Sequence, residues 1–264
     1  MDETLSPLIL RALQDNPRPL EFFLREQSHL PGPRANLKLV DDVSNLLAEV
    51  VSTREEDVRR VIEYLMRDEK TLEVNTPDEF VVLCGVVACG LCAAVYAAWR
   101  TRMIARLSEF ACNASWRVRE GTAIAFQRML EAAPEETSVC LRIWASEGNC
   151  WQQRASIAAI AEPAFMHDME MREAAFDMQQ VIMRRFHAIP LSERKREDVR
   201  VLRQAMGYTL SVITAALPEQ GFALMREYAS WDDADINWIL RENLKKKRLA
   251  KFSDQVEFVA KHLT

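Results

Sequence analysis

The sequence predicts an all-α fold, a right-handed α-solenoid of stacked antiparallel helix pairs, and three observations predict it. The first is a recurring helix-opening pattern, Trp-x-x-Arg, which follows a short polar turn at Trp116–Arg119, Trp151–Arg154 and Trp238–Arg241. The second is the 35 residues between the first two tryptophans (151 minus 116), a distance within the period of helix-pair repeats. The third is a count of only 7 glycines, because turns between helices need fewer left-handed residues than β-hairpins need.

Residues 1–75 are predicted to form an acidic N-terminal helical cap. Acidic residues concentrate there, at Asp41–Asp42 and Glu55–Asp57. The segment Pro31–Pro33 must be a turn, since a proline inside a helix removes a backbone hydrogen bond. Apolar residues at helical spacing place four helices in the cap, at about residues 7–13, 20–28, 36–51 and 58–65.

A long apolar helix is predicted to follow the cap. Thr76 is the expected N-cap and Pro77 the first helical residue, and the run Val81–Trp99 then contains no charge. The run is long enough to span a bilayer, so a transmembrane segment is one interpretation. It is rich in small residues, however, and stands alone among amphipathic helices. The sequence therefore favours a helix buried inside a protein that is not embedded in a membrane.

The six cysteines are expected to be free thiols. The opening Met-Asp-Glu-Thr-Leu lacks the basic region and apolar core of a signal peptide, so a cytoplasmic location is expected. Cys89 and Cys92 form a C-x-x-C pair, which suits a redox couple or half of a zinc site. No second C-x-x-C and no nearby histidine accompanies the pair. We therefore expect buried apolar cysteines, with no metal and no cofactor.

Residues 76–264 are predicted to form one continuous array of helix pairs. The tryptophans of the repeated pattern are expected to pack as plates between successive pairs. After the apolar helix, further helices are expected at 101–112, from Trp116, from Pro134, from Trp151 to Glu162, at 171–186, at 198–217, from Pro218 and from Trp238.

The repeated pattern resembles HEAT-like helical repeat proteins. That family places an Asp in the turn and an early Arg in the second helix, as Trp116–Arg119 and Asp235–Arg241 do here. The resemblance covers roughly residues 76–264. It implies a right-handed superhelix whose concave face binds another macromolecule without needing catalytic residues.

The chain is also similar in outline to the alkylpurine DNA glycosylases, which use the same repeat architecture. Those enzymes hold the damaged nucleotide with tryptophans and place a catalytic Asp on the concave surface. The grouping in this chain that imitates theirs is Trp231, Asp232, Asp233, Asp235 and Trp238. Since these aspartates lie in a turn, where helix capping already explains them, no catalytic role is carried over.

The motifs of familiar enzymes are absent from the sequence. There is no Gly-rich phosphate loop, no G-x-S-x-G and no H-E-x-x-H. The expected function is therefore non-catalytic binding of another macromolecule, with a protein as the favoured partner and a monomer as the expected state. The alternative is a DNA-binding protein or a glycosylase. A pI of about 5.6 counts against DNA, which needs cations along a whole face.

The basic stretch after Trp238 supplies the candidate binding residues. Its helix is expected to continue through Arg248, so that Arg241, Lys245 and Arg248 form one exposed stripe at i, i+4 and i+7. Together with Lys246, this stripe is predicted to contact an acidic protein surface or phosphates.

Arg119 and Arg154 are further binding candidates. Both lie early in the second helix of a pair, and as binding residues they would face the concave surface. The alternative is that each donates hydrogen bonds to turn oxygens or to neighbouring carboxylates.

Overall fold

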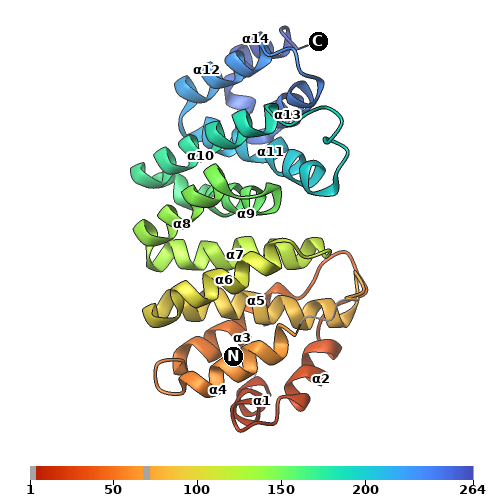
Figure 1. Cartoon of the computed structure of the whole chain (residues 1–264), viewed down its shortest axis with the longest axis vertical. Coiled ribbons are helices and arrows are strands. Elements are labelled where there is room, and N and C mark those ends of the chain that lie inside the picture. The colour runs from red at the N-terminus through yellow and green to blue at the C-terminus, as the bar shows by residue number, and fades with distance from the viewer. Residues whose placement is uncertain (1–3, 68–71, 264) are drawn as a thin grey trace. The chain divides into compact units, whose positions relative to one another are not determined.

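The computed structural model describes residues 4–67 and 72–263. Residues 1–3 of the opening segment, 68–71 of the expected cap and the last residue of the expected array lie outside the described residues. The described part contains fourteen α-helices, three short 3₁₀-helices and no strand (Figure 1). The all-α prediction is therefore confirmed. The chain divides into two compact units, Met1–Ala133 and Pro134–Thr264.

The first unit is organised around α5 (Pro77–Val95). This helix packs against α2, α3, α4, α6 and α7, and Figure 1 shows it lying between α3 and α7. Its other helices are α1 (Leu5–Leu13), α2 (Arg18–Glu26), α3 (Leu37–Val50), α4 (Glu55–Leu65), η1 (Ala97–Trp99), α6 (Arg100–Ala111) and α7 (Trp116–Ala132).

The start of α5 follows the local sequence. The Thr76 side chain accepts a hydrogen bond from Glu79 N–H, and Pro77 occupies the first turn. The central residues of the helix are buried, because its neighbours cover it on several sides. Within the part of the chain that is described, α5 is the one helix long and apolar enough to cross a membrane, and most of it is buried in this unit.

The C-terminal end of α5 differs from the expected Trp99. The helix ends at Val95, and Tyr96 is extended at φ −124° and ψ 92°. Arg100 donates hydrogen bonds to the Ala93 and Ala94 carbonyls, at 3.3 and 3.2 Å, and so caps the last turn. The Trp99 indole N–H meanwhile donates to Glu55 at 2.8 Å. These polar partners replace another turn of helix.

A buried ion pair links the turn at residues 31–33 to α5 and α7. Arg117 Nη1 donates to Glu79 Oε2 at 3.0 Å, and both side chains are almost fully buried. Arg117 Nη2 donates to the Gly32 carbonyl at 2.8 Å. The Ser115 hydroxyl, which also caps α7, donates to Glu79. The Glu79–Arg117 pair thus holds together three segments that are distant in the sequence.

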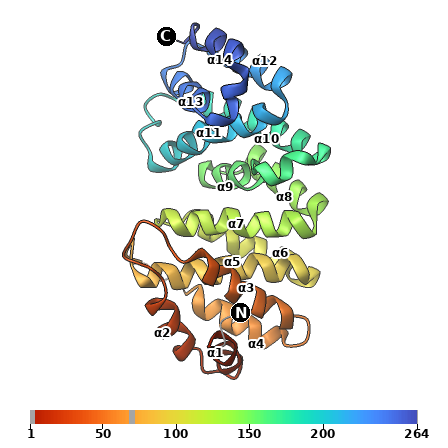
Figure 2. The same cartoon turned by 180° about the vertical axis from the view of Figure 1, so that it is seen from behind.

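The second unit is organised around α11 (Glu197–Ala216). This helix packs against α9, α10, α12 and α13 and against two 3₁₀-helices, and Figure 2 shows α9 and α13 on either side of it. The remaining helices are α8 (Pro134–Glu147), α9 (Cys150–Ile160), η2 (Pro163–His167), α10 (Met169–His187), α12 (Pro218–Ala229), α13 (Ala234–Leu244), η3 (Lys247–Phe252) and α14 (Ser253–Ala260).

The expected continuous helix from Trp238 through Arg248 is wrong, because α13 ends at Leu244. The buried Asn243 amide donates to the Ile239 and Met206 carbonyls, both at 2.7 Å, and its oxygen accepts from Ser211 N–H. These bonds tie the last turn of α13 to α11. Lys246 is then extended, and the chain turns to bury Leu249.

The three Trp-x-x-Arg patterns occupy different places in their helices. Trp116 is the first residue of α7, Trp151 the second of α9, and Trp238 the fifth of α13. The expectation of tryptophan plates is wrong for Trp116, which is 50% exposed with the Arg117 guanidinium over its ring. The pattern therefore recurs in sequence without marking one repeated packing position.

Candidate functional site

A basic pocket of about 770 Å³ lies in the second unit and is the candidate site. It combines a cationic rim with an apolar floor, and its residues come from three segments that are distant in the sequence. The lining residues are Pro163, Met166, His167, Arg172, Val212, Ala215, Ala216, Lys246, Lys247 and Arg248.

One side of the pocket comes from η2 and the start of α10. Pro163 opens η2 with its fixed φ, and Asp168 then caps α10 by accepting a hydrogen bond from Met171 N–H at 2.9 Å. Arg172 follows in the next turn. This local geometry puts His167 and Arg172 at the same pocket.

The opposite side comes from the chain that leaves α13. Because α13 stops at Leu244, Lys246 is extended and Lys247 and Arg248 begin η3, so these three cations do not form a stripe on one α-helix. Lys246, Lys247 and Arg248 therefore all line the pocket, although a continuous helix would have spread them over different faces.

The cations of the pocket have no close carboxylate partner in the described part of the chain. Within residues 4–67 and 72–263, none of Lys246, Lys247, Arg248 and Arg172 has a carboxylate within 4.0 Å. Arg172 also carries a buried Nε that makes no hydrogen bond in this part of the chain. Four positive charges next to one cavity create a field that favours an anionic ligand.

The floor of the pocket is apolar. Val212 and Met166 are buried, and Ala215 and Ala216 are half-buried at the end of α11. An apolar floor beside a charged rim offers contacts to both apolar and anionic groups. The arrangement suits a ligand that carries both carboxylates or phosphates and an apolar group.

Lys245 and Arg241 stand outside this pocket. Lys245 Nζ donates to Glu242 Oε1 at 2.6 Å, so a neighbouring carboxylate already compensates its charge. That hydrogen bond holds the pKa of Glu242 below its usual value, and Lys246 adds to the effect. Arg241 is exposed on α13. Of the predicted C-terminal residues, the structure brings Lys246 and Arg248 together and leaves Arg241 and Lys245 apart from them.

Arg119 and Arg154 are both buried. Arg119 lies in the first unit, where its Nη1 donates to the Asn113 and Ala114 carbonyls at 2.6 and 2.8 Å. Arg154 is 9% exposed in α9 and does not line the pocket. Arg119 thus makes the turn contacts that were its alternative role, and a binding role for either arginine stays a prediction.

The aspartates of the glycosylase-like grouping take part in a polar network. Asp233 caps α13 by accepting hydrogen bonds from Asp235 and Ile236 N–H, and Arg194 Nη1 donates to its carboxylate at 2.7 Å. His187 Nδ1 lies 3.1 Å from the same carboxylate. Burial raises the pKa of Asp233, but Arg194 and the Ile236 N–H outweigh it and leave the pKa below its usual value.

The cysteines of α5 are buried thiols. Burial raises the pKa of Cys89 to about 12, and it raises the pKa of Cys84 and Cys92 further. All three are therefore protonated at neutral pH, and a protonated thiol is neither a nucleophile nor a metal ligand. No group of three or more His, Cys, Asp or Glu side chains is placed to hold a metal ion in the described ranges.

Arg172 and the pocket floor were not found from the sequence. Nothing local to Arg172 relates it to residues 246–248, because the two segments meet only through the packing of η2 and η3 against α11. The sequence did indicate one side of the site, through the run of basic residues Lys245–Arg248.

Comparison with protein-family models, with curated proteins and with solved structures finds no match to this chain. The resemblance to HEAT-like repeats and to alkylpurine DNA glycosylases therefore stays a prediction.

Proposed function

We propose that the protein is a non-catalytic binding protein whose basic pocket receives an acidic segment of a partner protein. The observation that carries the proposal is the convergence of Arg172 and residues 246–248 on one cavity, without carboxylate partners among the described residues. Acidic side chains of the partner would pair with the rim, and an apolar side chain would contact the α11 floor.

We also propose the finer architecture, a right-handed HEAT-like solenoid. Its support is the succession of helices joined by short turns that contact each other, as α6 and α7, α8 and α9, and α12 and α13 do. Small-angle scattering by the intact protein tests this architecture, since a solenoid gives a larger radius of gyration than a globule of equal length.

The binding proposal is tested with a fluorescein-labelled peptide of alternating Glu and Leu residues. Fluorescence anisotropy should show binding to the wild type that weakens as salt is raised, because ions screen exposed charges. The variant Lys246→Ala/Arg248→Ala should bind about tenfold more weakly, as two exposed charge pairs are lost.

The matched control is Lys195→Ala/Arg200→Ala, which removes one lysine and one arginine from exposed positions outside the pocket. It should bind as the wild type does. Equal weakening by both variants would mean that overall charge, not the pocket, attracts the peptide, and the proposal would fail.

Duplex DNA is the second probe, because phosphates also suit a cationic rim. Tight duplex binding that is lost in Lys246→Ala/Arg248→Ala, with no binding of the acidic peptide, would favour the DNA-binding alternative. Release of a base from methylated duplex by the wild type would establish a glycosylase.

A further inference from the structure

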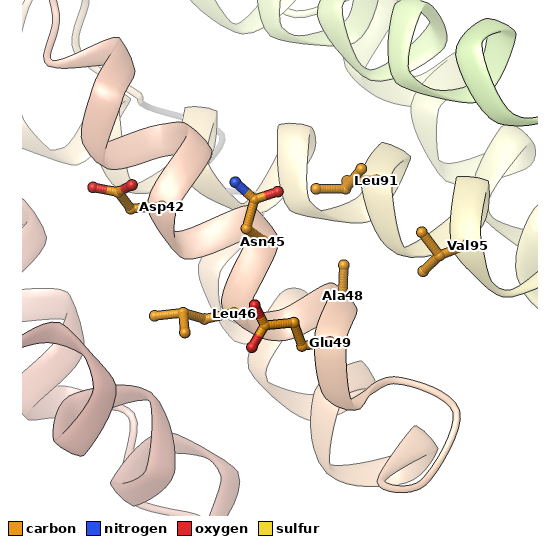
Figure 3. Close-up of a pocket in the computed structure, with 7 residues that line it drawn as sticks. All are labelled: Asp42, Asn45, Leu46, Ala48, Glu49, Leu91 and Val95. Atoms are coloured by element: carbon orange, nitrogen blue, oxygen red, sulfur yellow. The ribbon is translucent and has the colours of Figure 1, made fainter. Parts of the chain in front are cut away.

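The first unit carries a second groove, of opposite charge to the basic pocket. It is about 390 Å³ in volume and lies between α3 and the C-terminal end of α5. Figure 3 shows Leu91 and Val95 of α5 across from the α3 side chains. The lining residues are Asp42, Asn45, Leu46, Ala48, Glu49, Leu91 and Val95.

The floor of this groove is apolar and uncovered. Leu91 and Val95 are one helical turn apart on α5 and so share a face. Val95 is 57% exposed, although it ends the most buried helix of the unit. An exposed valine beside half-buried Leu46 and Leu91 leaves apolar surface that a partner can cover.

The charges of the groove are negative. No lysine or arginine lines it, and Glu49 has no cation within 4.0 Å in the described part of the chain. Asp42 pairs with Lys38 at 2.6 Å, but the Lys38 side chain is 78% exposed and is not part of the lining. Glu49 also lies in the last turn of α3, which contains no basic residue to offset the negative end of the helix dipole.

The spacing of the two carboxylates suits a helical ligand. Asp42 and Glu49 are seven residues apart on α3, so they are separated by two turns, or about 10 Å. Two cations at i and i+7 of a bound helix have the same separation. Apolar residues between those cations would then face Leu91 and Val95.

We propose that this groove binds an amphipathic helix of a partner protein, with an apolar face toward α5 and lysines or arginines toward Asp42 and Glu49. A lining with two carboxylates, no cation and an apolar floor is complementary in charge to a cationic helix and selects it over an acidic or uncharged one. The groove is too small for more than a few side chains, so the occupant is a short segment.

The experiment uses the intact protein and two synthetic labelled peptides, each a helix of about four turns with leucines on one face. The first carries lysines seven residues apart, and the second has glutamates in their place. Anisotropy should show binding of the lysine peptide and little binding of the glutamate peptide. Glu49→Lys should weaken binding of the lysine peptide about fivefold and should strengthen binding of the glutamate peptide.

The matched control is Glu26→Lys, an equal charge change at an exposed position of α2 outside the groove. It should leave both peptides unaffected. Val95→Ser tests the apolar floor of the groove. It should weaken binding of the lysine peptide without lowering the helix content of the protein, because Val95 is exposed. Equal binding of the two peptides by the wild type, or equal effects of the two charge reversals, would overturn the proposal.

Peptide binding at the acidic groove can be tested independently of the basic pocket. Glu49→Lys should leave binding of the acidic peptide by the second unit unchanged, because no residue is shared between the two linings. The variant Lys246→Ala/Arg248→Ala likewise tests only the proposed function, since it should lose binding of the acidic peptide and keep binding of the lysine peptide.

Discussion

At the scale of single residues, charged side chains have two distinct roles in this protein. Arg117 is buried, and its donors go to Glu79 and to a backbone carbonyl. Lys246 and Arg248 lie at a cavity and have no carboxylate partner in the described residues. The first kind holds distant segments together, whereas the second kind leaves charge for a ligand.

Removal of Arg117 should destabilise the first unit strongly. Arg117→Met leaves the buried Glu79 carboxylate without its cation, which costs about 3–5 kcal/mol in unfolding free energy. Adding Glu79→Gln should recover part of the loss, because it removes the uncompensated charge and keeps an acceptor for Ser115. Urea unfolding followed by circular dichroism measures both changes.

Arg128 provides the control, since its pair with Asp41 is partly exposed, at 3.1 Å. Arg128→Met should cost no more than about 1 kcal/mol. If Arg117→Met cost as little, the buried network would not hold the unit together.

Asp233 should make the second unit sensitive to acid. Its pKa in the folded protein lies below the ordinary value of 3.8, since Arg194 and the Ile236 N–H outweigh burial. A depressed folded pKa gives a stabilisation that is complete above about 3.8 and is lost as pH falls through the folded pKa. Asp233→Asn, which keeps an N-cap, should reduce the loss of stability below pH 4 in urea titrations. If the free energy of unfolding of Asp233→Asn fell with pH as steeply as that of the wild type, Asp233 would not be the source of the acid sensitivity.

At the scale of elements, α5 shows how small residues allow close packing. Gly90 faces α7, and a Cβ at this position would overlap the Cα and Cβ of Ala125. Gly121 of α7 similarly contacts Leu83 of α5. Small side chains at these contacts let the two helices approach closely, and this packing accounts for the composition that distinguishes α5 from a typical membrane span.

Gly90→Ala should therefore destabilise the protein by about 1–3 kcal/mol, in spite of the higher helix propensity of alanine. Gly207 of α11 is the comparison, because a Cβ there would lie 3.2 Å from Trp238 Cζ3 and 3.4 Å from Glu242 Cβ. Gly207→Ala should change stability by less than about 1 kcal/mol, since propensity offsets the tighter contact. Thermal melts of the two variants should differ clearly, and equal melts would contradict this account of α5.

At the scale of the whole molecule, the chain consists of two units that each contain a core. Phe80, Leu107 and Phe126 are fully buried in the first, and Phe186, Phe222 and Leu240 are fully or almost fully buried in the second. A separate core of this size is the usual condition for independent folding. The basic pocket and the acidic groove belong to different units, so each proposed binding surface depends on its own core.

Residues 1–133 and 134–264 should accordingly fold when they are produced separately. Each should give a helical circular dichroism spectrum and a single cooperative urea transition. A half that is unfolded or aggregated alone would show that its core needs the other unit. Peptide binding by the variants would then have to be measured with the intact protein.

Much of the fold was determined by the sequence itself. The spacing of apolar residues predicted the helices, Thr76 and Pro77 located the start of α5, and the uncharged run after them predicted its burial. These features depend on residues within a few positions of one another, which is the range over which helix caps and helical faces are formed.

Only the tertiary structure decided where the basic residues lie. The predicted stripe of Arg241, Lys245 and Arg248 failed because α13 ends at Leu244, Lys246 is extended and the chain then turns to bury Leu249. The pocket then formed from Arg172 and residues 246–248, which meet through packing against α11. The packing of η3 against α11, more than thirty positions away in the sequence, outweighed local helix propensity, because propensity is a weak preference that tertiary burial overrides.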